Sequence, residues 1–328
     1  MTTVTPMSAL PRSVARGLDT VLDRTIAPGF LKIGLEARRR MPGWPADPAP
    51  GCLEGRTAAV TGATSGLGLA TAEGLARLGA QVRLVVRDTD KGAQVRERLL
   101  ADVPGAQVHV DRCDVADLDD VRRFAADLDA DRLDVLVHNA GVMPPRRSES
   151  PQGHELTMAV HVLGPVLMTE LLLPRLRTGG DARVVTVTSG GMYAQALRAD
   201  DPEYHQGRYS PTTAYARSKR AQVELAPLLA ERWAPAGIGV HVTHPGWADT
   251  PGVVESLPRF HQITAPLLRD AAAGADTTVW VAAIQPPPPS GQLWHDRRAR
   301  PTHVLRRTRV TSTDVATLWD WVQVAAGL

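Results

Sequence analysis

The stretch that decides the fold is Thr61-Gly62-Ala63-Thr64-Ser65-Gly66-Leu67-Gly68. Before it, the apolar residues 57–60 predict a buried strand, and after it residues 69–78 have the composition of a helix. The glycines therefore lie on a strand-to-helix turn, where phosphates can approach the backbone and the helix N-terminus. An ordinary glycine turn of an α/β protein also fits this stretch. The first interpretation assigns cofactor binding to Gly62, Thr64, Ser65, Gly66, Leu67 and Gly68.

Composition narrows the class of protein. The chain has 328 residues, 43% hydrophobic and 22% charged, which is typical of a globular chain with one large domain or two small ones. A formal net charge of +2 gives no reason to expect a nucleic-acid partner. Cys52 and Cys113 are too few for a disulfide framework, and no Cys/His spacing indicates a metal site. We therefore expect no metal and a cytoplasmic location. No uninterrupted apolar run approaches 18 residues, so no membrane span is expected.

The order of the elements predicts the architecture. From residue 57 onwards, strand patterns alternate with helical patterns, which indicates βαβ units and a parallel sheet. Strands are expected at 57–60, 82–86, 107–110, 133–137, 183–188 and 238–243, with a short last strand at 291–294. We predict an α/β fold, a Rossmann-type doubly wound parallel sheet with helices on both faces. It forms a single domain over 56–328, behind an N-terminal amphipathic arm and Pro-rich linker over 1–55.

The arm permits two interpretations. It has an apolar stripe at helical spacing, formed by Val14, Leu18, Val21 and Leu22. It also has a basic run at 38–40. The arm can be a latch packed on the domain or on a second copy, or it can rest on an anionic membrane surface through residues 13–40. The acidic residues Asp19 and Asp23 on the polar face favour the latch.

Tyr215 and Lys219 carry the clearest chemical signal. They lie four residues apart and share one face of the helix expected at 213–233, just after the strand that ends in Ser189. A free tyrosine, with a pKa of about 10, is a poor base at neutral pH. A nearby ammonium, together with the positive nicotinamide of an oxidised cofactor, is expected to lower that pKa. Tyr215 can then exchange a proton with a substrate oxygen. Taken alone, the pair also fits a surface tyrosine beside a solvated lysine.

The motifs together resemble the short-chain dehydrogenase/reductase family. They occur in the family's order as Thr61–Gly68, Asn139-Ala140-Gly141, Ser189, Tyr215 with Lys219, and Pro245-Gly246. The resemblance covers residues 57 to about 295, and the glycine spacing is similar to the compact branch. The spacing between Ser189 and Tyr215 resembles the retinol-dehydrogenase-like group. The resemblance implies an oxidoreductase that interconverts carbonyls and alcohols with a nicotinamide cofactor.

The resemblance also implies a role for each matching residue. Ser189 would hydrogen-bond the substrate carbonyl oxygen, and Tyr215 would be the acid in reduction and the base in oxidation. Lys219 would bind the nicotinamide ribose and tune Tyr215. The remaining cofactor contacts would come from Asn139, Ala140 and Gly141, from Asp114 and Val115 at the adenine, and from Pro245, Gly246 and Thr250 at the nicotinamide.

His161 departs from the family's pattern. The family usually has an asparagine here, whose carbonyl helps to hold a water molecule in a proton relay. An imidazole can donate or accept a hydrogen bond, so His161 can take part in an altered relay. It can also be a satisfied core histidine. If the relay is broken, the chain would be an NADP(H)-binding protein with weak or no turnover.

Arg87 bears on the choice of cofactor. It follows the strand expected at 82–86, where an acidic residue would instead bind a free ribose 2′-OH. A guanidinium suits a 2′-phosphate by charge and geometry, so the expected cofactor is NADP, with NADPH preferred over NADH. Asp88 follows directly, and the two residues can also be solvated loop charges.

The substrate pocket is expected between two segments, Gly190–Thr212 and Val253–Leu268. The apolar residues of the second segment indicate an apolar small-molecule carbonyl or alcohol, although the same residues can belong to the core. We also expect a homo-oligomer. Because every motif begins at residue 57 or later, residues 1–50 are expected to be dispensable for hydride transfer but needed for solubility or assembly.

Overall fold

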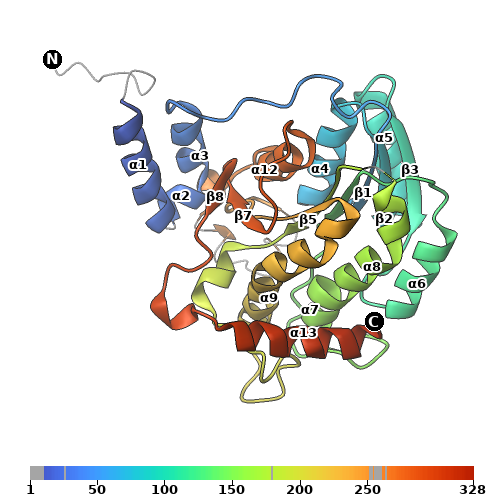
Figure 1. The fold of residues 1–328 in the computed structure, drawn as a ribbon. Helices are drawn as coiled ribbons and strands as arrows, with labels where there is room; N and C mark the ends of the chain where they lie inside the picture. Colours follow the sequence, from blue (N-terminus) through green and yellow to red (C-terminus); the bar gives the residue numbers. More distant parts are fainter. Residues whose placement is uncertain (1–10, 26, 179, 251–253, 255–260, 263) are drawn as a thin grey trace.

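The computed structural model describes residues 11–25, 27–178, 180–250, 254, 261–262 and 264–328. Across these residues the chain forms an eight-stranded sheet in the order β3-β2-β1-β4-β5-β6-β7-β8 (Figure 1). The strands are β1 (Thr57–Thr61), β2 (Gln81–Val86), β3 (Gln107–Arg112), β4 (Val135–His138), β5 (Ala182–Val187), β6 (Ile238–Thr243), β7 (Gln292–His295) and β8 (Arg298–Arg300). Neighbouring strands are parallel except β7 and β8. The predicted Rossmann-type doubly wound sheet is confirmed.

Helices cover both faces of the sheet. The larger ones are α4 (Gly66–Arg77), α5 (Thr89–Asp102), α6 (Leu118–Asp127), α8 (Gly164–Arg177), α9 (Pro211–Trp233), α12 (Ala271–Ala283) and α13 (Ser312–Ala326). Helices α4, α5 and α12 enclose one core, which contains Leu75, Leu99 and Val281. Helices α6, α8 and α9 enclose the other, and α13 packs across α8 and α9 on the outside (Figure 1).

The register of the sheet places the strand ends together. Thr61 of β1 pairs with Val85 of β2, and Val187 of β5 pairs with Thr243 of β6. All five positions of β1 are buried, as expected for the centre of a parallel sheet. Because the strands from β3 to β6 run in the same direction, their carboxyl ends form one edge. In open α/β sheets this edge is where ligands bind.

The long apolar helical segment Leu156–Arg177 is built from three pieces. These are α7 (Leu156–Met158), the π-helical turn η2 (Ala159–Leu163) and α8. Within the part of the chain that the structure describes, Leu156–Arg177 is the one helix long and apolar enough to cross a membrane, and 78% of its apolar window is buried inside the protein. Its hydrophobic side chains are therefore already covered by the core. A π-turn often marks a functional position, and this one contains His161.

The C-terminal part contains elements that the sequence did not indicate. β7 turns back into β8 through Asp296 and Arg297, which have φ values of +50° and +56°. Such two-residue turns usually contain Asn or Gly. Because Arg297 takes one of these positions here, the usual sequence signal of a hairpin turn is absent. Helix α13 was also missed, although Thr311 and Asp314 form a capping box at its start.

The N-terminal arm packs beside β7 and β8 through α1 (Arg12–Arg24), α2 (Ala27–Phe30) and α3 (Lys32–Arg39) (Figure 1). Helix α1 is oriented against its hydrophobic pattern. It buries Asp19 and Asp23 and exposes the apolar Val14, Leu18 and Val21. The reason is electrostatic, because arginines of α3 and β8 pair with the two buried aspartates.

Candidate active site

The glycine turn opens at the carboxyl edge of the sheet. Gly62 has a φ of +65°, and its N–H donates to the Val85 carbonyl at 3.0 Å. A Cβ at Gly68 would lie 2.3 Å from the Gly62 carbonyl oxygen, so only glycine lets α4 approach the turn this closely. Ser65 precedes α4 and makes no side-chain cap, which leaves the helix N-terminus open to an anion. This cradle, with Thr64, Gly66 and Leu67 along it, fits the pyrophosphate of a dinucleotide.

The Asn139-Ala140-Gly141 turn is joined to the glycine turn. Asn139 Nδ2 donates to the carbonyl oxygens of Thr61 at 3.1 Å and Gly62 at 3.3 Å. The main-chain N–H groups of Asn139 and Ala140 both donate to Thr61 Oγ1, at 3.0 and 3.1 Å. These bonds hold the ends of β1 and β4 together and line the expected cofactor groove.

Asp114 and Val115 follow β3 in a tightly bonded turn. The Asp114 N–H donates to Asp120 Oδ2 at 2.7 Å, and Asp114 Oδ1 accepts from the Ala116 N–H at 3.0 Å. Val115 is buried against α8, where a Cβ at Gly164 would lie 2.2 Å from the Val115 carbonyl oxygen. The turn thus has one defined shape at the edge where the adenine is expected.

Arg87 is an exposed cation at the end of β2. Its neighbour Asp88 is the N-cap of α5, where Oδ1 accepts from the Lys91 N–H at 3.0 Å and Oδ2 lies 3.5 Å from Lys91 Nζ. The carboxylate that complicated the sequence interpretation therefore already has local partners. Arg87 itself forms no ion pair within the described ranges.

Ser189, Tyr215 and Lys219 converge at the ends of β5 and α9. Lys219 is buried, its Nζ donates to the Val187 carbonyl at 2.8 Å, and Nζ lies 5.5 Å from the centroid of the Tyr215 ring. Thr188 Oγ1 donates to the Lys219 carbonyl at 2.9 Å, which fastens α9 to the strand. Ser189 begins the 3-10 turn η3 (Gly190–Ala194) and forms a hydrogen bond with the Tyr215 side chain.

Burial dominates the titration of this group. Burial raises the pKa of Tyr215, and the hydrogen bond from Ser189 opposes that shift. Burial lowers the pKa of Lys219 to about 7. Without the cofactor, burial therefore sets the direction of the Tyr215 shift, and the expected effect of the ammonium together with an oxidised nicotinamide stays a prediction. Near pH 7 Lys219 is only partly charged, and its Nζ is engaged by Val187.

His161 has a partner at each ring nitrogen. Nε2 accepts from the Val142 N–H at 3.0 Å, and Nδ1 lies 2.7 Å from Ser218 Oγ. Because Nε2 accepts, these bonds assign the proton to Nδ1, which donates to Ser218, while Ser218 Oγ donates to the Tyr215 carbonyl at 2.8 Å. Burial, with a smaller contribution from the Lys219 charge, lowers the pKa of His161 well below its usual value. The imidazole is thus neutral and fully bonded.

Two residues of this arrangement were missed by sequence reasoning. Ser218 joins His161 to the main chain of Tyr215, and Gln222 Nε2 donates to the His161 carbonyl at 2.8 Å. Both lie on α9, three and seven residues after Tyr215, and both are buried. Their spacing on the catalytic face of an amphipathic helix was the available signal.

Pro245 and Gly246 follow β6 in a loop that is held by hydrogen bonds. Gly246 has a φ of +75°, and its N–H donates to His244 Nδ1 at 2.9 Å. Thr250 is half-buried at the end of this loop. Most of the second expected pocket wall, Val253–Leu268, lies outside the described residues.

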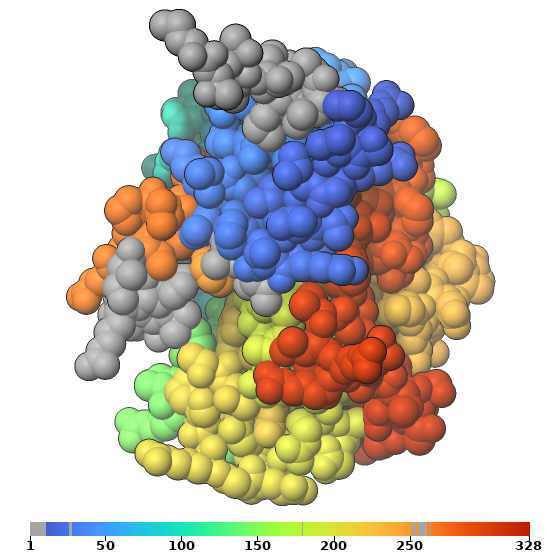
Figure 2. Space-filling view, turned by 90° about the vertical axis from the view of Figure 1, so that its left-hand side faces the viewer, coloured from blue at the N-terminus to red at the C-terminus, as the bar shows by residue number. Residues whose placement is uncertain are grey.

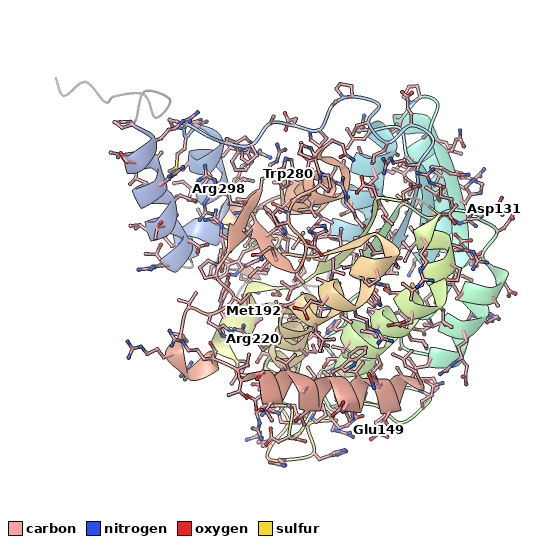
Figure 3. The ribbon with its side chains drawn as sticks, viewed as in Figure 1. Asp131, Glu149, Met192, Arg220, Trp280 and Arg298 are labelled. Carbon is pink, nitrogen blue, oxygen red and sulfur yellow. The ribbon has the colours of Figure 1, made fainter. Side chains whose placement is uncertain are left out.

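The first wall, after Ser189, is held by Arg220. This residue of α9 is fully buried, and its guanidinium reaches the Met192 carbonyl at 2.7 Å (Figure 3). It also donates to the Gln195 carbonyl at 3.1 Å and to Glu224 at 2.8 Å. The Arg220 guanidinium therefore holds the main chain of the segment after Ser189 in place.

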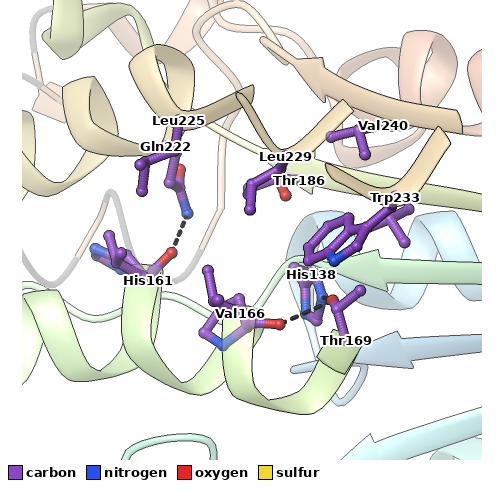
Figure 4. Close-up of a pocket in the computed structure, with 13 residues that line it drawn as sticks. His138, His161, Val166, Thr169, Thr186, Gln222, Leu225, Leu229, Trp233 and Val240 are labelled. Carbon is purple, nitrogen blue, oxygen red and sulfur yellow. Dashed lines mark hydrogen bonds between the residues drawn. The ribbon is translucent and has the colours of Figure 1, made fainter. Parts of the chain in front are cut away.

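A small cavity of about 30 Å³ lies on the other side of His161, between α8, α9 and the sheet (Figure 4). Its lining includes His138, Thr169, Gln222 and Trp233. The volume is that of about two water molecules, which is too small for an organic substrate. The cavity is therefore a space in the packing around His161 and not the substrate pocket.

Comparisons with known proteins agree with this geometry. Residues 56–259 match the short chain dehydrogenase family. Dehydrogenase/reductase SDR family member 12 of Bos taurus is 38% identical over 262 residues, which cover 78% of this chain and 81% of the relative. Retinol dehydrogenase 12 of Bos taurus is 34% identical over 273 residues, which cover 82% and 85%.

Solved structures share the fold. A crystal structure of a protein from Mycobacterium Paratuberculosis is 29% identical with a TM-score of 0.69, covering 85% of this chain and 98% of that one. An NAD(P)-dependent gluconate 5-dehydrogenase from Beutenbergia cavernae, with bound NADP, is 28% identical with a TM-score of 0.57, covering 75% and 96%. Fold, site and relatives define an NAD(P)-dependent oxidoreductase that acts on alcohols or carbonyls. The chain belongs to the short chain dehydrogenase family, in its retinol-dehydrogenase-like group.

Proposed function

We propose that the protein is an NADP-dependent oxidoreductase that interconverts an apolar carbonyl compound and its alcohol, with Tyr215 as the proton-transfer residue. The observation that carries this proposal is the convergence of Ser189, Tyr215 and Lys219 beside the glycine cradle at one edge of the sheet. A panel of aldehydes, ketones and alcohols, followed by nicotinamide absorbance with both cofactors, tests it. Absence of turnover across the panel would favour a cofactor-binding protein.

The chain's own residues divide the work around the substrate oxygen. When bound, the cofactor supplies the hydride in reduction and accepts it in oxidation. Ser189 donates a hydrogen bond to the carbonyl oxygen, which fixes the oxygen beside Tyr215. As the oxygen gains negative charge, the Tyr215 hydroxyl donates its proton to it. In oxidation the same hydroxyl group, as phenolate, takes the proton back.

Lys219 supports the phenolate of Tyr215. Its pKa of about 7 means that the ammonium gains or loses its proton at physiological pH. Burial raises the pKa of Tyr215, and the charged form of Lys219, whose Nζ lies 5.5 Å from the ring centroid, opposes this by stabilising the phenolate. We therefore assign Lys219 to tuning Tyr215 and, through its remaining protons, to binding the cofactor ribose.

His161 is proposed to position the site, because its ring has no free nitrogen for proton transfer. Its bond to Val142 shapes the turn that lines the cofactor groove, and its bond to Ser218 holds the first turns of α9. A further contact of His161, through its carbonyl, favours a second candidate, an NADP(H)-binding protein with weak turnover. The carbonyl of His161 already accepts from Gln222, where the family's relay needs an acceptor.

The preference for NADP rests on Arg87. Because Asp88 is engaged as the helix cap, the exposed guanidinium is the charge that the turn presents after β2. A bidentate cation at this position suits a ribose 2′-phosphate.

Arg87→Ala is expected to weaken NADPH binding by about 1.5–3 kcal/mol, the range for a hydrogen bond to a charged group. NADH binding should be unchanged, because NADH lacks the phosphate. Fluorescence titration of both cofactors measures this difference. Lys91→Ala is the matched control, since Lys91 lies in the same turn but is paired with Asp88. Equal affinities of the native protein for NADPH and NADH would refute the assignment.

The outer face of the arm fits an anionic membrane surface. The apolar Val14, Leu18, Val21 and Ile33 are between 42% and 67% exposed. Within the described part of the arm, the exposed basic residues without an ion pair are Arg12, Arg16, Arg24 and Lys32. Asp19 and Asp23, which argued against such a surface, are buried and face the domain.

Figure 2 shows the arm as a continuous dark-blue surface on one side of the molecule. We propose peripheral contact with an anionic bilayer through residues 13–40.

Sedimentation with phosphatidylserine-containing vesicles is expected to recover the protein, and pure phosphatidylcholine vesicles should recover much less. The double variant Leu18→Glu with Val21→Glu should bind at least about tenfold more weakly, because it removes the apolar stripe. Val324→Glu is the control, since this exposed apolar residue lies on α13, outside the arm. Equal recovery with both vesicle types would contradict the proposal. A mass that increases with concentration, lost in the double variant, would assign the stripe to a second copy.

A further inference from the structure

Phe30, at the end of α2, lies between two segments of the active site. Its side chain is 1% exposed, and its ring centroid is 4.4 Å from that of His244 and 6.0 Å from that of Trp247. The ring also borders the residue after Ser189, because a Cβ at Gly190 would lie 3.0 Å from Phe30 Cε2. One side chain of the arm thus contacts both the strand end that carries Ser189 and the loop expected at the nicotinamide.

The main chain of the arm completes this loop. The Trp247 N–H donates to the Phe30 carbonyl at 2.8 Å, and the Arg269 N–H donates to the Trp247 carbonyl at 2.9 Å. The Gly29 carbonyl accepts from Arg269 Nη2 at 3.0 Å. A Cβ at Gly246 would lie 2.7 Å from the Phe30 carbonyl oxygen, so the arm and the loop are closely packed. The shape of the loop therefore depends on the position of the arm.

Buried ion pairs hold the arm in that position. Arg38 Nη1 donates to the Gly29 carbonyl at 2.7 Å and to Asp296 Oδ2 at 2.6 Å, and Arg38 Nε donates to Asp19 at 2.7 Å. Asp296 also accepts from Arg269 Nη1 at 2.6 Å. Each of these charged side chains is buried. The Asp296 carboxylate, in the turn between β7 and β8, thus bridges Arg38 of the arm and Arg269, whose main chain pairs with Trp247 of the loop.

From these contacts we propose that residues 29–38 of the arm are a positioning element of the active site. They set the loop His244–Trp247 against Gly190 and so hold the nicotinamide half of the cofactor in register with Ser189. The inference rests on the proposed function, since it concerns the same cofactor. It replaces the expectation that residues 1–50 are dispensable for hydride transfer, because their removal would take away the acceptor of the Trp247 N–H and the partner of Asp296.

The experiment compares two ligands. NADPH occupies the whole groove, whereas 2′,5′-ADP occupies only its adenine half. Phe30→Ala is expected to weaken NADPH binding about tenfold, because the emptied space lets the nicotinamide-side loop relax, and to change 2′,5′-ADP binding by less than about twofold. Val324→Ala is the control, since Val324 is an exposed apolar residue on α13, outside the arm and outside the site. It should leave both affinities unchanged.

Phe30→Leu, which restores most of the volume, is expected to restore most of the NADPH affinity. Melting curves confirm that each variant is folded. If Phe30→Ala does not fold, Phe30→Leu and Arg38→Lys undergo the same comparison, with a smaller but still selective loss of NADPH expected. Equal weakening of both ligands, or no change in either, would overturn the inference. Failure of the native protein to bind NADPH is a different result, which removes the proposed function itself.

Discussion

Tyr215→Phe is expected to lower turnover by about 10²–10⁴-fold, the range for loss of a general acid or base. NADPH affinity and folding should stay close to native, because the variant keeps the ring that packs against His161 with a centroid distance of 5.3 Å. The rate of nicotinamide absorbance change, measured with a substrate from the carbonyl panel, gives the first quantity. A fluorescence titration gives the second.

Two further variants test whether the loss of turnover in Tyr215→Phe comes from proton transfer. Ser189→Ala should cost less than Tyr215→Phe, because water can replace one neutral hydrogen bond. His161→Asn restores the family's usual residue, so turnover should hold or rise if the histidine only positions the site. Near-native turnover in a Tyr215→Phe variant that binds cofactor normally would rule out the mechanism.

Mild acid is expected to unfold the protein. Burial lowers the pKa of His138 to about 3, of His241 to about 4 and of His295 to about 3, and it lowers the pKa values of His161 and His244 well below the usual value. Below pH 6.5 the unfolded chain binds protons at these positions that the folded chain does not. The free energy of unfolding therefore falls as the pH falls. Each of the five histidines contributes to this loss between pH 6.5 and pH 5, so the free energy of unfolding is expected to fall steeply over this range.

Urea unfolding at a series of pH values between 8 and 5 measures this slope. His138→Leu should reduce the slope by about one proton, and Thr169 keeps its bond to the Pro165 carbonyl at 2.9 Å in that variant. Val324→Ala should not change the slope, because it alters an exposed apolar residue and removes no titratable group. A free energy of unfolding that is constant between pH 7 and pH 5 would contradict the assignment of these histidines as buried and neutral.

Much of the fold was predictable because local signals and packing agree. The glycine turn after residues 57–60 includes Gly68, where a Cβ would lie 2.4 Å from Asn139 Nδ2. The sequence motif and the packing of α4 therefore require the same residue. The helix expected at 213–233 is observed as α9, and α12 begins with a cap of the same kind. Their caps, Ser210 and Asp270, are readable signals.

Other features depend on tertiary partners that no local pattern contains. The hydrophobic stripe of α1 predicts an inward apolar face, but Arg300 of β8, nearly 300 positions away, draws Asp19 inward instead. Likewise, the role of His161 follows from Val142 and Ser218, which only the folded chain places at its two ring nitrogens. The contact of Phe30 with the active site has the same origin.

The most direct test of the central claim is hydride transfer itself. NADPH carrying deuterium at the nicotinamide carbon is incubated with the protein and an apolar aldehyde or ketone from the panel, and the alcohol is analysed by mass spectrometry. The account predicts one deuterium on the former carbonyl carbon, from one of the two faces of the nicotinamide, with formation slowed by Tyr215→Phe and unaffected by Val324→Glu. An alcohol that contains no deuterium with either of the two forms of NADPH labelled on one face, or no alcohol from any member of the panel despite tight NADPH binding, would contradict it.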